Sequence, residues 1–296
     1  MSSYGKRTRH HFRGLAVFAI VLVLVIVIAF VWMQSRQSAT VPEDAIYLYF
    51  VDVGQADASF ILTDEGSVLI DAGTSDSAPT LYHTINTGGD TLSYLIITHP
   101  HDDHMGGALY ILDKMDVQNI ILPMDTAKTA VYKKFLGAVE AEGAEVFYAD
   151  ADFTFVLDEI TFTFLAPLSD IGDTNENSSV IRMDYGGFSA LFTGDAEKKS
   201  EKLQLEAYGN FPYGKLDVDV LKVGHHGSSS SSTAAYLKAV TPEYAVISCG
   251  AGNSYGHPTK AVLDRLEEAD AEVWRTDLSG TIVFTIAGET VTVAGG

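Results

Sequence analysis

The segment Thr98-His99-Pro100-His101-Asp102-Asp103-His104 decides how this chain is interpreted. It follows an apolar run typical of a buried strand and precedes two glycines, where a helix is expected to begin. Residues two apart point to the same side of an extended segment, so His99 and His101 face one way. Asp103 and His104 then lie on the turn beyond the strand. The segment thus offers two imidazoles to one metal ion and a carboxylate and an imidazole to a second. Such ligands suit zinc, and also manganese or iron.

Three other places in the sequence put the same kinds of side chain just after an apolar run. Asp195 ends the stretch LFTGD, and a carboxylate there can bridge two metals. Two histidines follow the stretch LKVG, and another lies in YGHP. Side chains at the carboxyl ends of strands gather at one edge of a layered α/β fold. Of the nine histidines, these junctions account for six: His99, His101, His104, His225, His226 and His257.

The body of the chain, from Ile46 onward, mixes short apolar runs with helical patterns. About a dozen strands and about five helices, unevenly interleaved, predict an α+β or layered α/β fold. The first four expected strands are 46–53, 59–63, 67–73 and 92–99. The expected helices are 104–114, 127–141, 197–208, 233–239 and 259–269.

The amino-terminal part predicts a membrane anchor. Residues 15–33 are 19 consecutive uncharged residues. As a helix they would span about 28 Å, which matches the hydrocarbon core of a bilayer. The basic tip, residues 1–14, is expected in the cytoplasm by the positive-inside rule. Residues 34–45 are then a linker, and the body is extracytoplasmic. The alternative is a cleaved signal peptide and a secreted body.

Charge and cysteine content limit the possible partners. The chain has 19 basic and 39 acidic residues, a net charge of −20. A body this acidic is a poor general binder of nucleic acid, so an anionic substrate would need a local positive centre such as a metal. Cys249 is the single cysteine of the chain. This excludes an internal disulfide framework and a cysteine-rich zinc module, and we expect no disulfide-linked partner.

At this point the motifs resemble a known family. HxHxDH is similar to the metal motif of the metallo-β-lactamase superfamily, and DVGQAD (52–57) is similar to the DVGQGD opening of its ComEC-like branch. The resemblance implies an αββα sandwich over residues 46–296. The other motifs that recur in the same order are Leu69–Gly73, Asn177-Ser178-Ser179, Thr193–Ala196, Gly224–Ser228 and Tyr255–Pro258.

We expect two ions, zinc or manganese, with Asp195 as the bridging ligand. The position after Gly224 favours His225 as a ligand and leaves His226 behind it or facing the substrate. The expected ligand groups are His99, His101 and Asp195 for one ion, and Asp103, His104, Asp195 and His225 for the other.

One departure concerns the first ion. Many hydrolases of the superfamily place a third histidine near the position of Asn177, whereas this chain has no histidine between His104 and His225. The amide oxygen of Asn177 is then a candidate ligand. With such an oxygen-rich ligand set, the site could bind either one ion or two, and manganese competes with zinc as the bound metal.

Several residues near the ligands have two interpretations each. Asp71 either orients the loop that carries the ligands or caps a turn. Asp52 and Asp57 are candidates for ligand support and equally for turn capping. Gln55, in the same motif, is a candidate for substrate contact or ligand support.

Three further positions bear on the reaction itself. Gly227 and Ser228 open a serine-rich stretch before an expected helix, where N–H groups and hydroxyls either bind an anion or simply cap the helix. His257 is expected to donate a proton to a leaving oxygen or to contact a phosphate. Asp103 is expected to take part in catalysis as well as in metal binding.

The expected function is a membrane-anchored, extracytoplasmic metal-dependent hydrolase that attacks a phosphodiester with a metal-bound hydroxide. The resemblance implies a nuclease, but the acidic body disfavours long contacts with a polyanion. The alternatives are hydrolysis of a lactone or of a small, cell-wall-linked phosphate ester, and a non-catalytic metal-binding module. A true β-lactamase is disfavoured, because Asn-Ser-Ser replaces the usual histidine.

Overall fold

The structure, a computed structural model, describes residues 45–209 and 214–296. The predicted basic tip (1–14), membrane span (15–33) and nearly all of the linker (34–45) lie outside the described residues. Among the residues that are described, none of the helices combines the length and the apolar character needed to cross a bilayer.

The predicted strands form two sheets. Within the described residues the first sheet has eight strands, and β3 to β6 run parallel to one another. Its strands, in spatial order, are β15 (Thr290–Gly295), β14 (Ile282–Ala287), β1 (Ile46–Phe50), β2 (Ser59–Leu62), β3 (Ser67–Ile70), β4 (Thr91–Ile96), β5 (Asp116–Pro123) and β6 (Glu145–Ala149).

The second sheet has seven strands in the described part of the chain. Four of them, β10 to β13, run parallel, and the others pair antiparallel. In spatial order they are β13 (Glu272–Arg275), β12 (Tyr244–Ile247), β11 (Val220–Lys222), β10 (Phe188–Phe192), β9 (Val180–Tyr185), β8 (Ile160–Ala166) and β7 (Thr154–Leu157).

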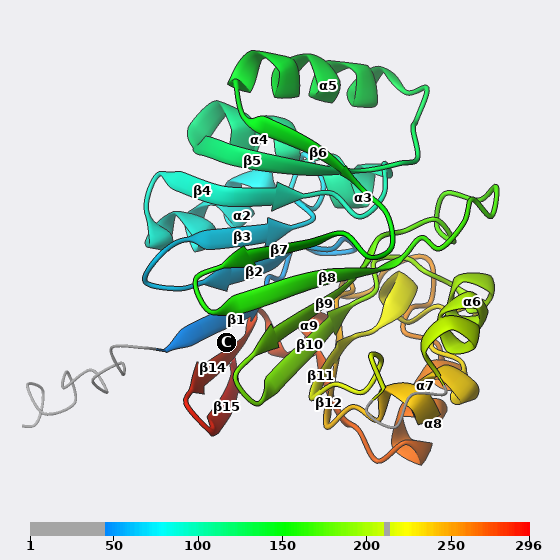
Figure 1. The fold of residues 1–296 in the computed structure, drawn as a ribbon. Helices are drawn as coiled ribbons and strands as arrows, with labels where there is room; N and C mark the ends of the chain where they lie inside the picture. The colour runs from blue at the N-terminus through cyan, green and yellow to red at the C-terminus, as the bar shows by residue number, and fades with distance from the viewer. Residues whose placement is uncertain (1–44, 210–213) are drawn as a thin grey trace, which may run out of the picture. The chain divides into compact units, whose positions relative to one another are not determined.

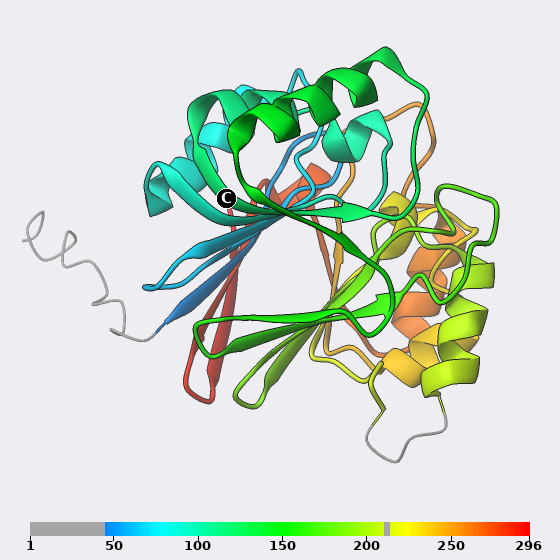
Figure 2. The same ribbon diagram turned by 45° about the horizontal axis from the view of Figure 1, so that its top comes forward.

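The two sheets face each other, and helices cover their outer faces (Figures 1 and 2). Large apolar side chains such as Phe50, Phe162 and Phe192 fill the space between the sheets, because each sheet turns one face inward. Two further apolar cores lie under the helices. The predicted αββα sandwich is therefore confirmed. The covering helices are α2 (Ala78–Ile85), α4 (Ala108–Lys114) and α5 (Ala130–Glu142) on the first sheet, and α6 (Lys198–Tyr208), α7 (Ala234–Val240) and α8 (Lys260–Glu268) on the second.

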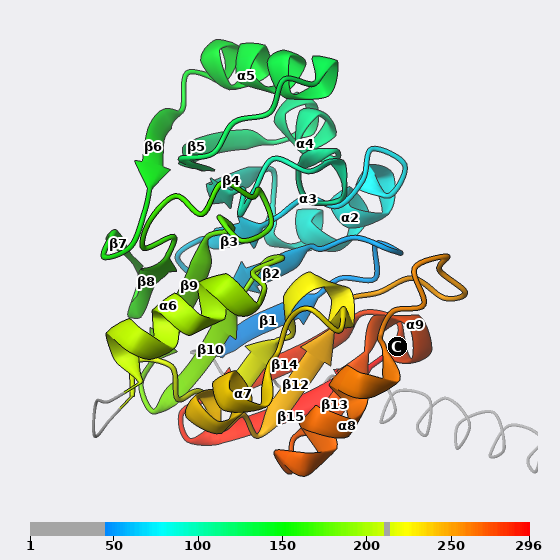
Figure 3. The same cartoon turned by 90° about the vertical axis from the view of Figure 1, so that its right-hand side faces the viewer.

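The parallel strands bring the predicted ligands to one edge. The carboxyl ends of β3, β4, β10, β11 and β12 meet there, and Figure 3 looks onto this edge. Since chemistry in such folds is placed at the carboxyl ends of parallel strands, the edge is where a site is expected.

Some elements differ from the sequence-based expectation. The single helix expected at 104–114 is two helices, α3 (Asp102–Met105) and α4. They are separated at Gly106 and Gly107, where the backbone N–H of Gly107 donates to the carbonyl oxygen of Gly73 at 3.0 Å instead of continuing the helix. A Cβ at Gly107 would lie 2.1 Å from the carbonyl oxygen of Ala72, so only glycine fits this close approach. The strands β7 and β15 and the short helix α9 (Thr276–Ser279) were not predicted.

Candidate metal centre

Asp71, which follows β3, holds the loop that carries the first histidines. The backbone N–H of Thr98 donates to Asp71 Oδ1 at 2.8 Å, and the Thr98 hydroxyl donates to Oδ2 at 2.7 Å. His104 Nδ1 lies 2.7 Å from the same Oδ2. A carboxylate on one imidazole nitrogen fixes the ring and leaves the other nitrogen for a metal. Of the two interpretations of Asp71, the geometry favours orientation of the ligand loop.

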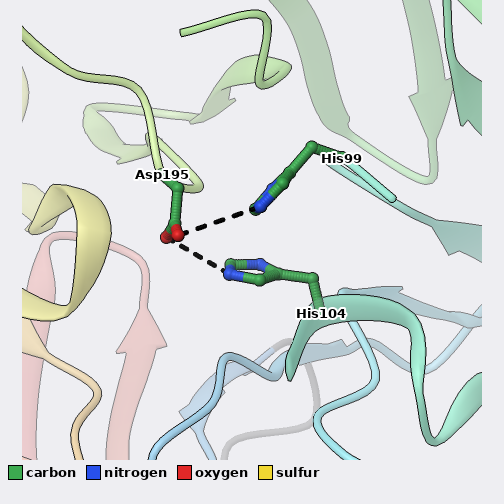
Figure 4. Close-up of side chains that lie close together, drawn as sticks. All are labelled: His99, His104 and Asp195. Carbon is green, nitrogen blue, oxygen red and sulfur yellow. Dashed lines mark ion pairs between the residues drawn. The ribbon is translucent and has the colours of Figure 1, made fainter. Parts of the chain in front are cut away.

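Asp195 lies at the centre of the site, in the loop after β10. Its Oδ1 is 3.2 Å from His104 Nε2, and its Oδ2 is 3.8 Å from His99 Nε2 (Figure 4). His99 and His104 are fully buried, and Asp195 is 2% exposed. His101 is exposed on the outer side, with Nδ1 3.0 Å from His99 Nε2. The structure thus brings together side chains from two different sheets, as the sequence predicts.

The backbone before Asp195 explains why a glycine precedes it. Gly194 has φ 48°, a left-handed conformation that favours glycine. A Cβ at this position would lie 2.9 Å from the hydroxyl oxygen of Thr98 and 3.2 Å from the Cβ of Ser178. The backbone N–H of Asp195 then donates to Ser178 Oγ at 3.2 Å. This close approach is what carries the carboxylate across to the histidines of the first sheet.

The adjacent histidines after β11 both enter the site. His225 and His226 have φ values of 46° and 52°, a conformation that costs a non-glycine residue on the order of 1 kcal/mol or more. His226 Nε2 lies 3.3 Å from Asp103 Oδ2 and 3.8 Å from Asp195 Oδ1. His225 Nε2 lies 3.6 Å from Asp195 Oδ2. Strained backbone at this turn directs both rings to the same carboxylate.

The donor atoms of this edge fit a divalent cation in either of two overlapping groups, which share His104. His99, His104 and Asp195 form one group whose ligand atoms lie within 4.8 Å of one another, and Asp103, His104 and His226 form a second. Asp195 Oδ1 and His104 Nε2 are buried but make no hydrogen bond, although buried polar atoms are normally satisfied. Imidazoles and carboxylates with unused, converging atoms are what zinc or manganese needs.

The electrostatics of the site agree with this assignment. Burial works to raise the pKa of Asp195, but His104 and His226 beside it hold that pKa well below its usual range. Burial works to lower the pKa of His226, but Asp195 and Asp57 raise it to about 10. The pKa of His99 is well below its usual value because of burial and the neighbouring His104. Without a cation, the carboxylates are therefore balanced by protons on the histidines around them.

Two of the predicted ligands, His225 and Asn177, have surroundings that differ from those of the other candidates. His226, and not the favoured His225, lies in the group with Asp103 and His104. The physical reason is the left-handed turn, which buries His226 against that group and leaves His225 on the opposite oxygen of Asp195. The amide oxygen of Asn177, proposed as a metal ligand, instead accepts the N–H of Ile171 at 2.8 Å.

The helix start that follows Gly227 and Ser228 is bonded by an acidic side chain. Glu201 is buried and its carboxylate accepts the N–H groups of Ser232 and Thr233 at the start of α7. The Thr233 side chain caps the same helix. The N–H groups of Ser232 and Thr233 are therefore bonded within the protein, which favours the helix-capping interpretation at the start of α7.

The remaining predicted residues lie around the rim or beneath it. Asp52 Oδ1 accepts the N–H of Gly54, so Asp52 caps a turn. The side-chain oxygen of Gln55 accepts the N–H of Gly250, which ties the loop after β12 to the first sheet. The ring of His257 lies 5.7 Å from that of His225, and its buried Nδ1 makes no hydrogen bond.

Two residues near the centre were missed by sequence reasoning. Lys222 is 2% exposed, and its Nζ lies 2.6 Å from Asp57 Oδ2. Asp57 Oδ1 in turn lies 3.1 Å from His226 Nδ1. Glu197 Oε1 lies 2.8 Å from His225 Nδ1. The available signal was a lysine inside the apolar strand that leads to the two histidines, since lysine is rarely buried unless paired.

Comparisons with known proteins agree with the fold and the motifs. Residues 51–251 match the family model of the metallo-beta-lactamase superfamily. ComE operon protein 3 of Bacillus subtilis is 31% identical over 254 residues, which cover 79% of this chain and 32% of that protein. Competence protein ComA of Neisseria gonorrhoeae is 34% identical over 257 residues, which cover 84% and 34%. The chain thus spans about a third of the length of these relatives.

A solved structure supports the architecture. The metallo-beta-lactamase fold protein YhfI from Bacillus subtilis superposes with a TM-score of 0.56 at 13% identity, over 82% of this chain and 100% of that one. At this identity the likeness concerns the fold alone. The family match over residues 51–251 establishes that the chain belongs to the metallo-beta-lactamase superfamily, and its sequence is similar to about a third of the length of the two competence-related proteins above.

Proposed function

We propose that this protein is a metal-dependent phosphodiesterase. The observation that carries the proposal is the buried Asp195 carboxylate, whose two oxygens face different sets of imidazoles. Divalent cations held by these groups supply Lewis acidity and a water of lowered pKa, which is the chemistry that phosphodiester hydrolysis requires. The family relationship supports a hydrolase of this kind.

The residues of the site would have three roles: binding the cations, orienting a ligand and transferring a proton. His99, His104, His226, Asp103 and Asp195 would hold the cations, and His101 and His225 lie close enough to complete the set. Asp71 and Thr98 hold the orientation of His104. His257 would hand a proton to the leaving oxygen, and this role is supported by a ring nitrogen without a hydrogen bond and by the closeness of its ring to that of His225.

Charge favours a small or short substrate. The chain carries a net charge of −20, so beyond the cations the protein repels a long polyanion. A short phosphodiester needs contacts only at the centre itself. We therefore propose a diester of limited length as the substrate, and not extended double-stranded DNA.

We also propose that the enzyme is anchored in the cell membrane by residues 15–33, with the catalytic body outside the cytoplasm. The support is the length of the uncharged run and the basic tip before it. Membrane fractionation with tags at both ends tests this proposal. An anchored protein retains both tags in the membrane fraction, whereas a cleaved leader leaves only the carboxyl-terminal tag in the soluble fraction.

The test of the activity uses the purified full-length protein loaded with zinc or with manganese. Hydrolysis of bis-p-nitrophenyl phosphate and of short single-stranded DNA is measured, with Asp195→Ala as the inactive control and Lys202→Ala, on the solvent-exposed face of α6, as the matched neutral control. Diester cleavage that is lost only in Asp195→Ala supports the proposal. Cation binding without diester cleavage, together with turnover of a lactone, overturns it in favour of a carboxylic ester hydrolase. Cation binding without any turnover favours a metal-binding module.

A further inference from the structure

His225 differs from the other histidines of the metal centre in how it reaches Asp195. Its Nε2 lies 3.6 Å from Asp195 Oδ2, but within the described residues it belongs to none of the groups of converging ligand atoms. Its side chain is 24% exposed, whereas His99 and His104 are fully buried. Burial therefore restrains the ring of His225 less than theirs, and its direction depends on what holds its other nitrogen.

A carboxylate holds that other nitrogen. Glu197 Oε1 lies 2.8 Å from His225 Nδ1. An ionised carboxylate only accepts hydrogen bonds, so Nδ1 is the donor of this bond. In a neutral ring Nε2 then keeps the free lone pair, and Nε2 is the atom that faces Asp195. A carboxylate behind an imidazole in this way fixes both the tautomer and the orientation of a ring that binds metal.

The start of helix α6 does not explain the position of Glu197. Glu197 is the N-cap residue of α6, yet its side chain makes no capping hydrogen bond. Serine, threonine, aspartate and asparagine are preferred for capping. The N–H groups of Lys199 and Ser200 donate instead to the buried carboxylate of Glu176, at 3.1 and 2.8 Å. The helix start is thus served by Glu176, and the Glu197 carboxylate is left for His225.

Backbone hydrogen bonds fix the two residues relative to each other and to the centre. The N–H of Lys198, the residue after Glu197, donates to the carbonyl oxygen of Ser230 at 3.1 Å. The N–H of His225 donates to the carbonyl oxygen of Gly194, also at 3.1 Å. The start of α6, the turn after β11 and the loop that carries Asp195 are therefore joined. The carboxylate and the imidazole are held in place before a cation arrives.

We propose that Glu197 is a positioning residue that directs His225 Nε2 towards a cation at Asp195 Oδ2. Two ligands of one tetrahedral zinc ion lie about 3.3 Å apart, since each is about 2.0–2.2 Å from the metal. The 3.6 Å between His225 Nε2 and Asp195 Oδ2 is close to this separation. This inference rests on the cation binding of the proposed function, and it identifies a residue that supports a ligand without touching the cation.

The first test measures zinc affinity in the full-length protein by competition with a chromogenic chelator. We expect Glu197→Ala to raise the dissociation constant of a bound zinc ion by about 10- to 100-fold, the usual effect of losing such a supporting carboxylate. Glu197→Gln should cause a smaller rise, because its side-chain oxygen still accepts the Nδ1 proton. Glu206→Ala, which removes an exposed carboxylate from the same helix, is the matched control and should keep the wild-type affinity.

A double-mutant cycle shows whether Glu197 acts through the imidazole. A residue that only positions His225 has no effect once the ring is gone, so Glu197→Ala should not weaken zinc binding further in a His225→Ala background. A further 10-fold or greater loss in the double variant would overturn the proposal. Glu197 would then act independently of His225, as a ligand itself or through the stability of the loop.

Affinity and turnover together separate this inference from the proposed function. If the wild type binds zinc and Glu197→Ala binds it equally well, the positioning role is wrong and the phosphodiesterase is unaffected. If the cycle gives the expected result but the zinc-loaded wild type cleaves no diester, the positioning role stands and the proposed activity is wrong. If the wild type binds no zinc and no manganese, both are wrong.

Discussion

Lys222 and Asp57 form a buried ion pair beneath the metal centre, with Nζ 2.6 Å from Oδ2. The other oxygen of Asp57 lies 3.1 Å from His226 Nδ1, so the pair reaches a candidate ligand. Burial works to raise the pKa of Asp57, but Lys222 and His226 hold that pKa below its usual range. The carbonyl oxygen of Ser248, 3.0 Å from Nδ1, and the ionised Asp57 beside it keep the ring of His226 turned so that Nε2 faces Asp103 and Asp195.

This pair predicts a large and partly reversible loss of stability. Lys222→Met removes one of the two cationic partners of buried Asp57 and leaves only His226, so we expect a loss of up to about 3–5 kcal/mol of unfolding free energy. Adding Asp57→Asn removes that charge, so the double variant is expected to recover much of the loss. Urea unfolding of the metal-free protein, followed by circular dichroism, measures both. A double variant that is less stable than Lys222→Met by the full cost of a second independent substitution would contradict a direct pairing.

Asp71 is expected to control metal affinity without touching the metal. Asp71→Asn weakens the hold on His104 Nδ1 and on Thr98, and loss of such a supporting carboxylate lowers metal affinity about 10- to 100-fold. Asp76→Asn, an exposed carboxylate near the same loop, is the matched control and should leave affinity unchanged. Competition with a chromogenic chelator gives the dissociation constants. Equal affinities for the two variants would show that Asp71 only shapes the turn.

Cation binding is expected to release protons. Carboxylates raise the pKa of His226 to about 10 and that of His104 well above its usual value, against the effect of burial, so both are protonated at pH 7 in the metal-free protein. A ligating imidazole must lose that proton, so metal affinity should increase as pH rises towards 10. In the metal-free protein the stability contributed by the pairing of His226 is complete below about pH 6.5, its ordinary pKa, and is lost as pH rises through about 10.

Calorimetry of cation binding in two buffers of different ionisation enthalpy counts the protons released. His226→Ala should reduce the count, whereas His83→Ala, an exposed histidine on α2, should not. The same heat in both buffers would mean that the histidines are neutral before the cation binds.

Asn177 provides a test of the corrected ligand set. Its amide bonds to Ile171 and Asp170, so Asn177→Ala should cost about 1 kcal/mol of stability through that loop and leave the metal content unchanged. Asp195→Ala, by contrast, removes the carboxylate shared by both sets of histidines and should lower the metal content. Elemental analysis measures the metal content of the purified variants. A lower metal content in Asn177→Ala would show that the amide of Asn177 is a metal ligand.

The spacing of residues in the sequence predicted much of the candidate site, and the reasons are local. His99, His101, Asp103 and His104 lie on one short strand-to-helix turn, so their convergence depends on only a few backbone angles. Asp195 was predicted as a site residue because it stands at the carboxyl end of an apolar strand. The sequence could not predict which of His225 and His226 lies beside Asp103. The directions of these two adjacent rings depend on the left-handed backbone turn that the fold imposes.

What the sequence by itself determined is a layered α/β body, the edge that carries the chemistry and the residue types that gather there, because periodic burial and strand-end motifs are local properties of the chain. The αββα order of the layers was implied by the family resemblance. What only the tertiary structure decided is the pairing of groups distant in sequence. Lys222 meets Asp57, Glu201 accepts the N–H of Thr233 at the start of α7, and the ring of His257 lies against that of His225. These contacts depend on the packing of one sheet against the other and on the loop conformations at their shared edge, which no local pattern encodes.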